Sequence, residues 1–170
     1  MKNVDITFII VAYKSDDDVI GCIASIIYNH LGEENFEIII VDNYQGINNL
    51  QRLLAVTFPG CNMIRYFKSS CNGGYGWGNN FGSQFSNGKI LIFCNPDIRL
   101  VVPITKKVTE EFRKDPKIGA VSVKFIDGSN NLYPNPEIMG GAHVFFRRIL
   151  ILLARLGVFN KIWPSGSFFI

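Results

Sequence analysis

Three residues that could perform chemistry, Asn95, Pro96 and Asp97, follow an apolar run that ends at Cys94. Hard cations such as Mg²⁺ and Mn²⁺ are usually held by one or two carboxylates together with the phosphates of a substrate. Asp97 could hold such a cation against a diphosphate leaving group, while the Asn95 amide donates to a hydroxyl or phosphate oxygen. The same residue types also form ordinary turns, so both interpretations stay open.

Two further candidates, Tyr13 and Asp42, stand at the ends of the first two apolar runs. The carboxylate of Asp42 could accept a hydrogen bond from the imide N–H of uracil or thymine, and would then select a pyrimidine nucleotide. It could equally cap a helix or close an Asx-turn. Tyr13 could stack on the face of a base, or it could pack in the core.

A glycine-rich segment, CNGGYGWGNN, occupies residues 71–80. Glycines permit positive φ angles and a close approach of the backbone to a ligand. The spacing matches neither G-x-G-x-x-G nor a P-loop that ends in Lys-Ser/Thr, which argues against an NAD enzyme and an ATPase. The segment could also be a tight strand-to-helix turn with Asn80 near the helix cap.

The elements that must position these residues alternate strand-like apolar runs with helical periodicity. Strands are predicted at 6–13, 36–41, 62–67, 89–94 and 118–125. Helices are predicted from Ser15 to about residue 31, at 48–56, from the end of the glycine-rich turn at 71–80 to about residue 87, and at 103–114. Ser15, with Asp18 three residues later, predicts a side-chain cap on the first helix. This order predicts an α/β fold of three layers, α/β/α, around a mostly parallel, Rossmann-like sheet.

Polar residues gather where four of the predicted strands end. In parallel sheets, ligands bind beyond the carboxyl ends of the strands. The polar groups at these ends lie at residues 13–16, 42–43, 72–74 and 95–97. We therefore predict that these four groups meet in one crevice.

The overall composition fits a single globular domain. Of the 170 residues, 48% are hydrophobic and 18% are charged, and the net charge of +3 gives no case for binding nucleic acid. The four cysteines form no C-x-x-C pair and show no metal-type spacing with His30 or His143, and Cys22 and Cys94 lie in apolar runs. We therefore predict a structural role for all four and a reducing compartment. With no signal-peptide pattern and no apolar run of about 20 residues, a cytoplasmic protein is expected.

The pattern changes after residue 126, and residues 1–126 are predicted to form the binding core. The stretch 127–170 opens with a turn-rich loop and contains an apolar, arginine-bearing segment at 144–159. That segment could lie on an anionic membrane surface at its cytoplasmic face, pack on the sheet, or drive self-association as a homo-oligomer. The final residues, SGSFFI, resemble the opening of a strand, so 127–170 is expected to be the incomplete start of an acceptor-side region.

Taken together, FIIVAYKSDDDVIGCIASI, FEIIIVDN, NGGYGWGNNFGSQFSNGKILIFCNPDI and SGSFFI resemble glycosyltransferase family 2. The nearest resemblance is to its bacterial rhamnosyltransferase-like members. It implies a GT-A fold and inverting transfer of a sugar such as rhamnose from a dTDP- or UDP-sugar, with Mg²⁺ or Mn²⁺ as cofactor. The implied acceptor is a saccharide or a lipid-linked molecule, in the synthesis of cell-surface polysaccharide or O-antigen.

The resemblance also assigns site residues. Asn95-Pro96-Asp97 stands in the place of the family's D-x-D motif, and the Asn79-Asn80 pair marks the start of a helix that borders the nucleotide. Asn95 replaces the first acid of that motif, so the metal would depend on Asp97 alone, and Asn79 replaces a residue that is often basic. The residues implied to bind the nucleotide sugar are Val11, Ala12, Tyr13, Asp16, Asp42, Asn43, Asn72, Gly73, Gly74, Asn79, Asn95 and Asp97.

No catalytic base is assigned, because the family's downstream acidic motif is expected beyond Ile170, and the chain alone is predicted to transfer sugar poorly. Two other classes remain. One is a non-catalytic sugar-nucleotide-binding fragment or regulatory domain derived from such a transferase. The other is a nucleotidyltransferase, for which a glycine- and arginine-rich signature would follow the first strand, where KSDDD stands instead.

Overall fold

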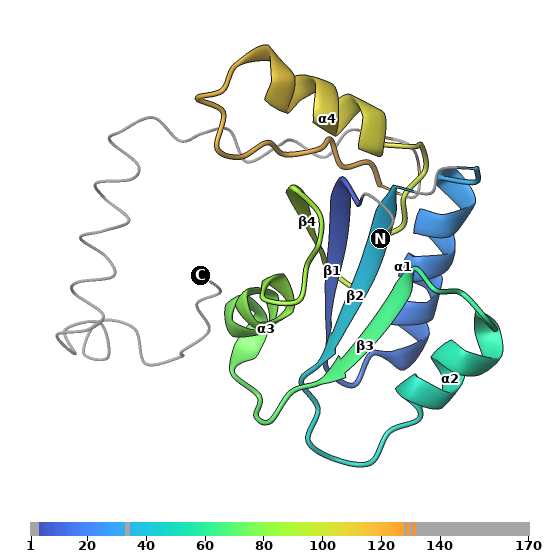
Figure 1. Ribbon diagram of the computed structural model, residues 1–170. Coiled ribbons are helices and arrows are strands. Elements are labelled where there is room, and N and C mark those ends of the chain that lie inside the picture. The colour runs from blue at the N-terminus through green and yellow to red at the C-terminus, as the bar shows by residue number, and fades with distance from the viewer. Residues whose placement is uncertain (1–3, 33–34, 128, 130, 132–170) are drawn as a thin grey trace, which may run out of the picture. The chain divides into compact units, whose positions relative to one another are not determined.

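The computed structural model describes residues 4–32, 35–127, 129 and 131. The chain divides into two compact units, Met1–Val121 and Ser122–Ile170. The sheet and all the regular helices described here belong to the first unit (Figure 1). The boundary that the sequence suggests after residue 126 stays a prediction.

Four parallel strands form one sheet in the order β3-β2-β1-β4. The strands are β1 (Ile6–Ala12), β2 (Phe36–Asp42), β3 (Ile64–Lys68) and β4 (Ile90–Cys94). The helices are α1 (Asp16–Asn29), α2 (Leu50–Thr57), α3 (Gly74–Ser83) and α4 (Thr105–Lys114). The first four strands and four helices are therefore confirmed in type and order.

The two central strands, β1 and β2, are buried at every position, as their unbroken apolar sequences predict. Alternate side chains point to opposite faces of a strand. The face that includes Phe8, Ile10 and Ile40 packs with α1 and α2, and the face that includes Ile9 and Val41 packs with α3. Figure 1 shows α3 on one side of the sheet and α1 with α2 on the other. The predicted three-layer α/β/α fold is confirmed.

The start of α1 differs in detail from the prediction. Ser15 is the N-cap residue, but its side chain makes no capping hydrogen bond; its Oγ instead accepts from the backbone N–H of Tyr13 at 3.3 Å. Lys14, between them, has a φ of 54° and turns the chain sharply from β1 into α1. Three acids in the first turn, at residues 16–18, interact favourably with the positive end of the helix.

The glycine-rich segment is mostly helix rather than turn. Helix α3 begins at Gly74, so Asn79 and Asn80 lie inside it, and their predicted place at its start is wrong. A Cβ added to Gly78 would lie 2.7 Å from Val11 Cγ1, and one added to Gly82 would lie 2.8 Å from Ile9 Cγ2. These two glycines let the helix pack closely against the sheet, which explains why a glycine-rich sequence is helical here.

The predicted strand at 118–125 is absent, because these residues pair with no strand and only Ile126 forms an isolated bridge. Most of their side chains are exposed, and a β-rich composition does not form a strand without a partner and a surface to pack on. The predicted helix at 144–159 and the SGSFFI strand lie outside the described residues. Within the described part of the chain, no helix is both long and apolar enough to cross a membrane.

All four cysteines are free thiols. Burial raises the pKa of Cys22 to about 11, against a smaller lowering by Arg99, and raises that of Cys94 to about 12. Both side chains are buried in the core, so the structural role predicted for all four cysteines is confirmed for these two and stays a prediction for the other two. Cys71 is exposed and Cys61 half-buried.

Candidate functional site

The carboxyl ends of the four strands meet at one edge of the sheet, which we call the C-terminal edge (Figure 1). The register places Ala12, Asp42 and Lys68 level with one another on three adjacent strands. Cys94 pairs with Ile10, two residues before the end of β1. The turn that follows Cys94 therefore lies beside the end of β1, as the predicted crevice requires.

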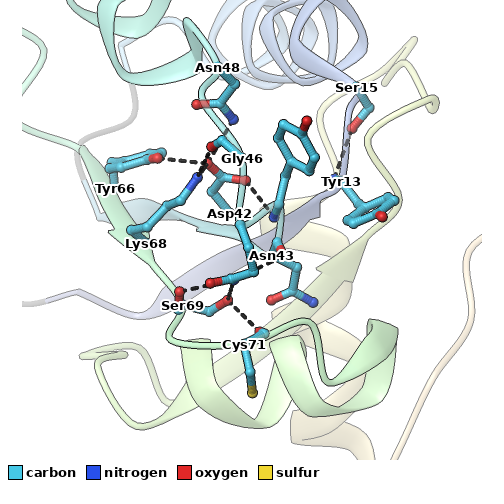
Figure 2. A network of polar contacts seen from close by, with 12 residues as sticks. Tyr13, Ser15, Asp42, Asn43, Gly46, Asn48, Tyr66, Lys68, Ser69 and Cys71 are labelled. Carbon is cyan, nitrogen blue, oxygen red and sulfur yellow. Dashed lines mark hydrogen bonds and ion pairs between the residues drawn. The ribbon is translucent and has the colours of Figure 1, made fainter.

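Asp42 is the centre of a polar network at this edge (Figure 2). Its side chain is 0% exposed and receives four donors. The backbone N–H of Tyr44 donates to Oδ1 at 2.9 Å. Oδ2 accepts from Asn48 Nδ2, from the hydroxyl of Tyr66 and from Lys68 Nζ, each at 2.8 Å.

These donors fix the charge of Asp42. Burial by itself would raise the pKa of the carboxyl, but the hydrogen bonds from Lys68, Asn48, Tyr66 and Tyr44 outweigh it and lower the pKa. Burial and the adjacent Asp42 carboxylate together raise the pKa of the Tyr66 phenol. Asp42 is therefore an anion at neutral pH. Each carboxylate oxygen offers about two acceptor positions. Oδ2 accepts from three donors, whereas Oδ1 accepts from one and so has one acceptor position free.

Two lysines and two tyrosines contact one another beside Asp42; three of the four are exposed and Tyr44 is half-buried. We call Tyr13, Lys14, Tyr44 and Lys68 the lysine–tyrosine cluster. The two tyrosine rings meet edge to face at 5.8 Å, and Tyr13 is 49% exposed, so it is not a core aromatic. Lys14 Nζ lies 5.7 Å from the ring centroid of Tyr13 and 5.1 Å from that of Tyr44. Lys68 Nζ lies 5.8 Å from the Tyr44 centroid.

Sequence reasoning missed three members of this cluster: Lys14, Tyr44 and Lys68. Their positions in the sequence could have indicated them, because each lies at the carboxyl end of a strand or within two residues of one. Of the residues predicted in the same place, Val11 and Ala12 have buried side chains and could reach a ligand only through the backbone. Asp16, the first residue of α1, is partly exposed.

The α3 side of the edge carries the predicted asparagines. Asn43 is buried, and its Nδ2 donates to the carbonyl of Gly74 at 3.0 Å, which joins the end of β2 to the start of α3. Asn72 Oδ1 accepts from the N–H of Gly74 at 3.1 Å, and both Asn72 and Gly73 are exposed. Among the described residues, the buried Oδ1 atoms of Asn43 and Asn79 have no hydrogen-bond partner.

Asn95, Pro96 and Asp97 form a turn closed by a bond of 3.4 Å from the N–H of Ile98 to the carbonyl of Asn95. The turn interpretation is thus confirmed, and it leaves the side chains of Asn95 and Asp97 exposed. No cluster of three or more His, Cys, Asp or Glu suited to a metal occurs among the residues that the structure describes. One carboxylate fits a cation whose other ligands are phosphates and water, which is a common arrangement for Mg²⁺.

The sequence from residue 7 to residue 165 matches the model of a family described as glycosyl transferase family 2. The chain belongs to glycosyl transferase family 2. No curated protein matches the sequence of this family member. The resemblance inferred from the sequence motifs is confirmed at the level of the family.

Solved structures share the fold of this family 2 chain. TarS of S. aureus, residues 1–349 in complex with UDP, is 15% identical with a TM-score of 0.57, over 65% of this chain and 32% of that chain. The mannosyltransferase PcManGT from Pyrobaculum calidifontis, in complex with GDP-Man and Mn²⁺, is 21% identical with a TM-score of 0.59, over 71% and 35%. The parallel sheet with its helices is therefore a GT-A nucleotide-sugar transferase fold. This chain covers about a third of each of those two solved chains.

Proposed function

We propose that this chain forms the donor-binding part of a glycosyltransferase that uses a dTDP- or UDP-sugar. The observation that carries the proposal is the meeting of Asp42, Tyr13 and the Asp97 turn at one sheet edge of a family 2 chain. Strand β1 separates β2 from β4, so two inter-strand spacings, together about 10 Å, lie between the strand that Asp42 ends and the strand that the Asp97 turn follows. A nucleoside diphosphate is long enough to bridge such a separation.

The base would lie over β1 and β2. The free acceptor position on Asp42 Oδ1 suits the single imide N–H of uracil or thymine, and guanine would offer two adjacent donors instead. Asp42 is fully buried, so the base must displace neighbouring groups to reach it. Tyr13 offers a half-exposed ring for stacking. Asn43, Asn72, Gly73, Gly74 and Asn79 would border the nucleotide, with Asp16 and the backbone of residues 11–12 at its other side.

The diphosphate would extend toward β4. Asp97, with Asn95 beside it, would hold Mg²⁺ or Mn²⁺, and the cation when bound supplies charge stabilisation to the diphosphate leaving group. The support is chemical, since an exposed carboxylate at the correct edge suits a hard cation. The mannosyltransferase PcManGT, of the same fold, is described in complex with Mn²⁺.

The finer parts of the proposal rest on the family. Transfer with inversion to a saccharide or lipid-linked acceptor, the use of rhamnose, and a role in polysaccharide or O-antigen synthesis follow from the resemblance of the sequence motifs. A cytoplasmic site of action belongs to the same proposal. The catalytic base stays unassigned.

The proposal is tested by calorimetric titration of the full chain with UDP, dTDP and GDP, each with and without Mn²⁺. We expect UDP or dTDP to bind more tightly than GDP, and Mn²⁺ to strengthen the binding. In Asp97→Ala the cation-dependent part of the affinity should vanish while the preference among bases survives. Absence of binding by all three nucleotides would refute the donor site, and an unchanged Mn²⁺ effect in Asp97→Ala would remove the metal assignment alone.

A further inference from the structure

A lysine with no carboxylate partner among the described residues lies where the proposed donor must cross the C-terminal edge of the sheet. Asp42 ends β2 and Asp97 follows β4, and β1 lies between these two strands. A ligand that joins Asp42 to Asp97 therefore passes over the residues that follow β1. Those residues are Tyr13 and Lys14, and both are exposed.

The backbone of Lys14 has an uncommon conformation. Its φ of 54° is the only positive value among the described residues other than glycine. Residues other than glycine rarely adopt this region, at a cost of about 1 kcal/mol or more, and such outliers concentrate at functional sites. Here the left-handed turn accompanies the placement of the Lys14 ammonium over the rings of Tyr13 and Tyr44.

The two lysines of the lysine–tyrosine cluster differ in their partners. Lys68 Nζ lies 2.8 Å from Asp42 Oδ2, so its charge already balances a buried carboxylate. Lys14 forms no ion pair with any residue that the structure describes; the nearest acids in sequence begin at Asp16, and Asp18 pairs with Arg99 at 3.6 Å. An exposed ammonium on a flexible stem is a common ligand of phosphate groups.

We infer that Lys14 binds the diphosphate of the nucleotide and neutralises part of its charge. The inference rests on the proposed donor site and adds to it a cation that the chain itself supplies. Asn95 offers no charge where a second carboxylate would help to hold a metal. The Lys14 ammonium and the metal ion at Asp97 would therefore each neutralise part of the diphosphate charge. The binding of a nucleoside diphosphate should therefore keep a substantial part of its affinity when the metal is removed.

The inference predicts different effects on nucleotide and nucleoside. The change Lys14→Asn removes the charge and keeps a residue that tolerates a positive φ. In EDTA at low ionic strength, we expect it to weaken UDP binding about three- to tenfold and to leave uridine binding unchanged. The UDP affinity of the wild-type chain should fall as salt is added, and that of Lys14→Asn should fall less.

Three controls accompany this titration. Lys14→Arg keeps the charge and should keep most of the UDP affinity. Lys89→Gln removes a lysine that is paired with Asp5 next to the start of β4, at the opposite edge of the sheet, and should change nothing. Lys68→Gln removes the charge beside Asp42 and should weaken uridine and UDP alike, because its effect passes through the base-binding carboxylate.

The outcomes separate this inference from the proposed function. If the wild-type chain binds UDP and Lys14→Asn binds it equally well, Lys14 is not a diphosphate ligand and the donor site stands. Equal weakening of uridine and UDP by Lys14→Asn would also overturn the inference, since a phosphate contact cannot act on the nucleoside. Failure of the wild-type chain to bind UDP, dTDP or GDP overturns both.

Discussion

At the scale of single residues, Asp42 has a structural role that does not depend on any ligand. Its carboxylate accepts from Asn48 in the connection after β2 and from Tyr66 and Lys68 on β3. A buried anion is stable only when donors surround it, and buried donors in turn need their acceptor. Removing the carboxylate therefore affects the fold as well as any base recognition.

We expect Asp42→Asn to lower the free energy of unfolding by about 1–3 kcal/mol, because an amide NH₂ would face groups that themselves donate. The change Tyr66→Phe removes one of three donors to Oδ2 and should cost less, about 0.5–1.5 kcal/mol. Urea unfolding of both variants and of the double variant measures these values. If the two single changes add without coupling, the hydrogen bond between Tyr66 and Asp42 contributes nothing to stability.

At the scale of elements, α3 shows how a glycine-rich sequence can form a close-packed helix. Glycines are poor helix formers, since they lose more backbone entropy than other residues on folding. In α3 this cost is offset by packing, because the missing Cβ of Gly78 leaves room for Val11. The helix start then lies close enough for Asn43 to donate to the carbonyl of Gly74.

Substitution of single glycines by alanine tests this packing. Gly78→Ala should destabilise the protein by about 1–3 kcal/mol, because its Cβ would lie 2.7 Å and 2.9 Å from the two methyl carbons of Val11. Gly76 lies in the same helix and has nothing within 4 Å of its added Cβ, so Gly76→Ala should be neutral or stabilising by up to about 1 kcal/mol. Thermal unfolding compares the two. Equal effects of both changes would contradict the packing explanation.

The elements also show what the sequence could and could not predict. Continuous apolar runs identify β1 and β2 correctly, because a strand that is buried on both faces needs apolar side chains at nearly every position. The predicted start of α3 is later than the observed start at Gly74, because a glycine-rich sequence indicates a turn unless its close packing against a strand is known. The strand expected at 118–125 failed for the converse reason, because suitable residues there have no partner strand. The predicted ends of the strands correctly place Asp42 and the Asp97 turn at the C-terminal edge of the sheet. The contacts of Lys14 with the tyrosine rings depend on its positive φ angle, which no sequence motif predicts.

At the scale of the whole sheet, the carboxylate of Glu37 on β2 joins residues from both neighbouring strands and from the segment before β4. Its carboxylate accepts from Thr7 on β1 at 2.8 Å and from Arg65 on β3 at 3.1 Å. It also accepts from the backbone N–H and the side chain of Asn87, just before β4, at 2.6 Å and 2.9 Å. One buried side chain on β2 therefore connects three strands and the segment that leads into β4, far from the C-terminal edge.

This network makes the stability of the sheet dependent on pH. Burial alone would raise the pKa of Glu37, but the hydrogen bonds from Asn87, Thr7 and Arg65 outweigh it and lower the pKa. A carboxyl whose pKa is lower in the folded state stabilises the protein fully above its unfolded value, about 4.3. That contribution is lost as the pH falls from there through the folded pKa. Asp42, whose pKa is also lowered, adds a second loss in the acid range.

We expect Glu37→Gln to lower the free energy of unfolding at neutral pH by about 1–3 kcal/mol, because the amide cannot accept from all the donors around it. As the pH falls below about 4.3 and through the lower pKa of the folded state, the wild-type carboxyl becomes neutral, as the amide already is. The difference in free energy of unfolding between the two proteins should therefore narrow. Denaturant unfolding at a series of pH values from neutral to acid measures the difference. Glu110→Gln, at an exposed position of α4, is the matched control and should follow the wild type throughout. A gap that stays constant with pH would mean that the charge of Glu37 does not stabilise the sheet.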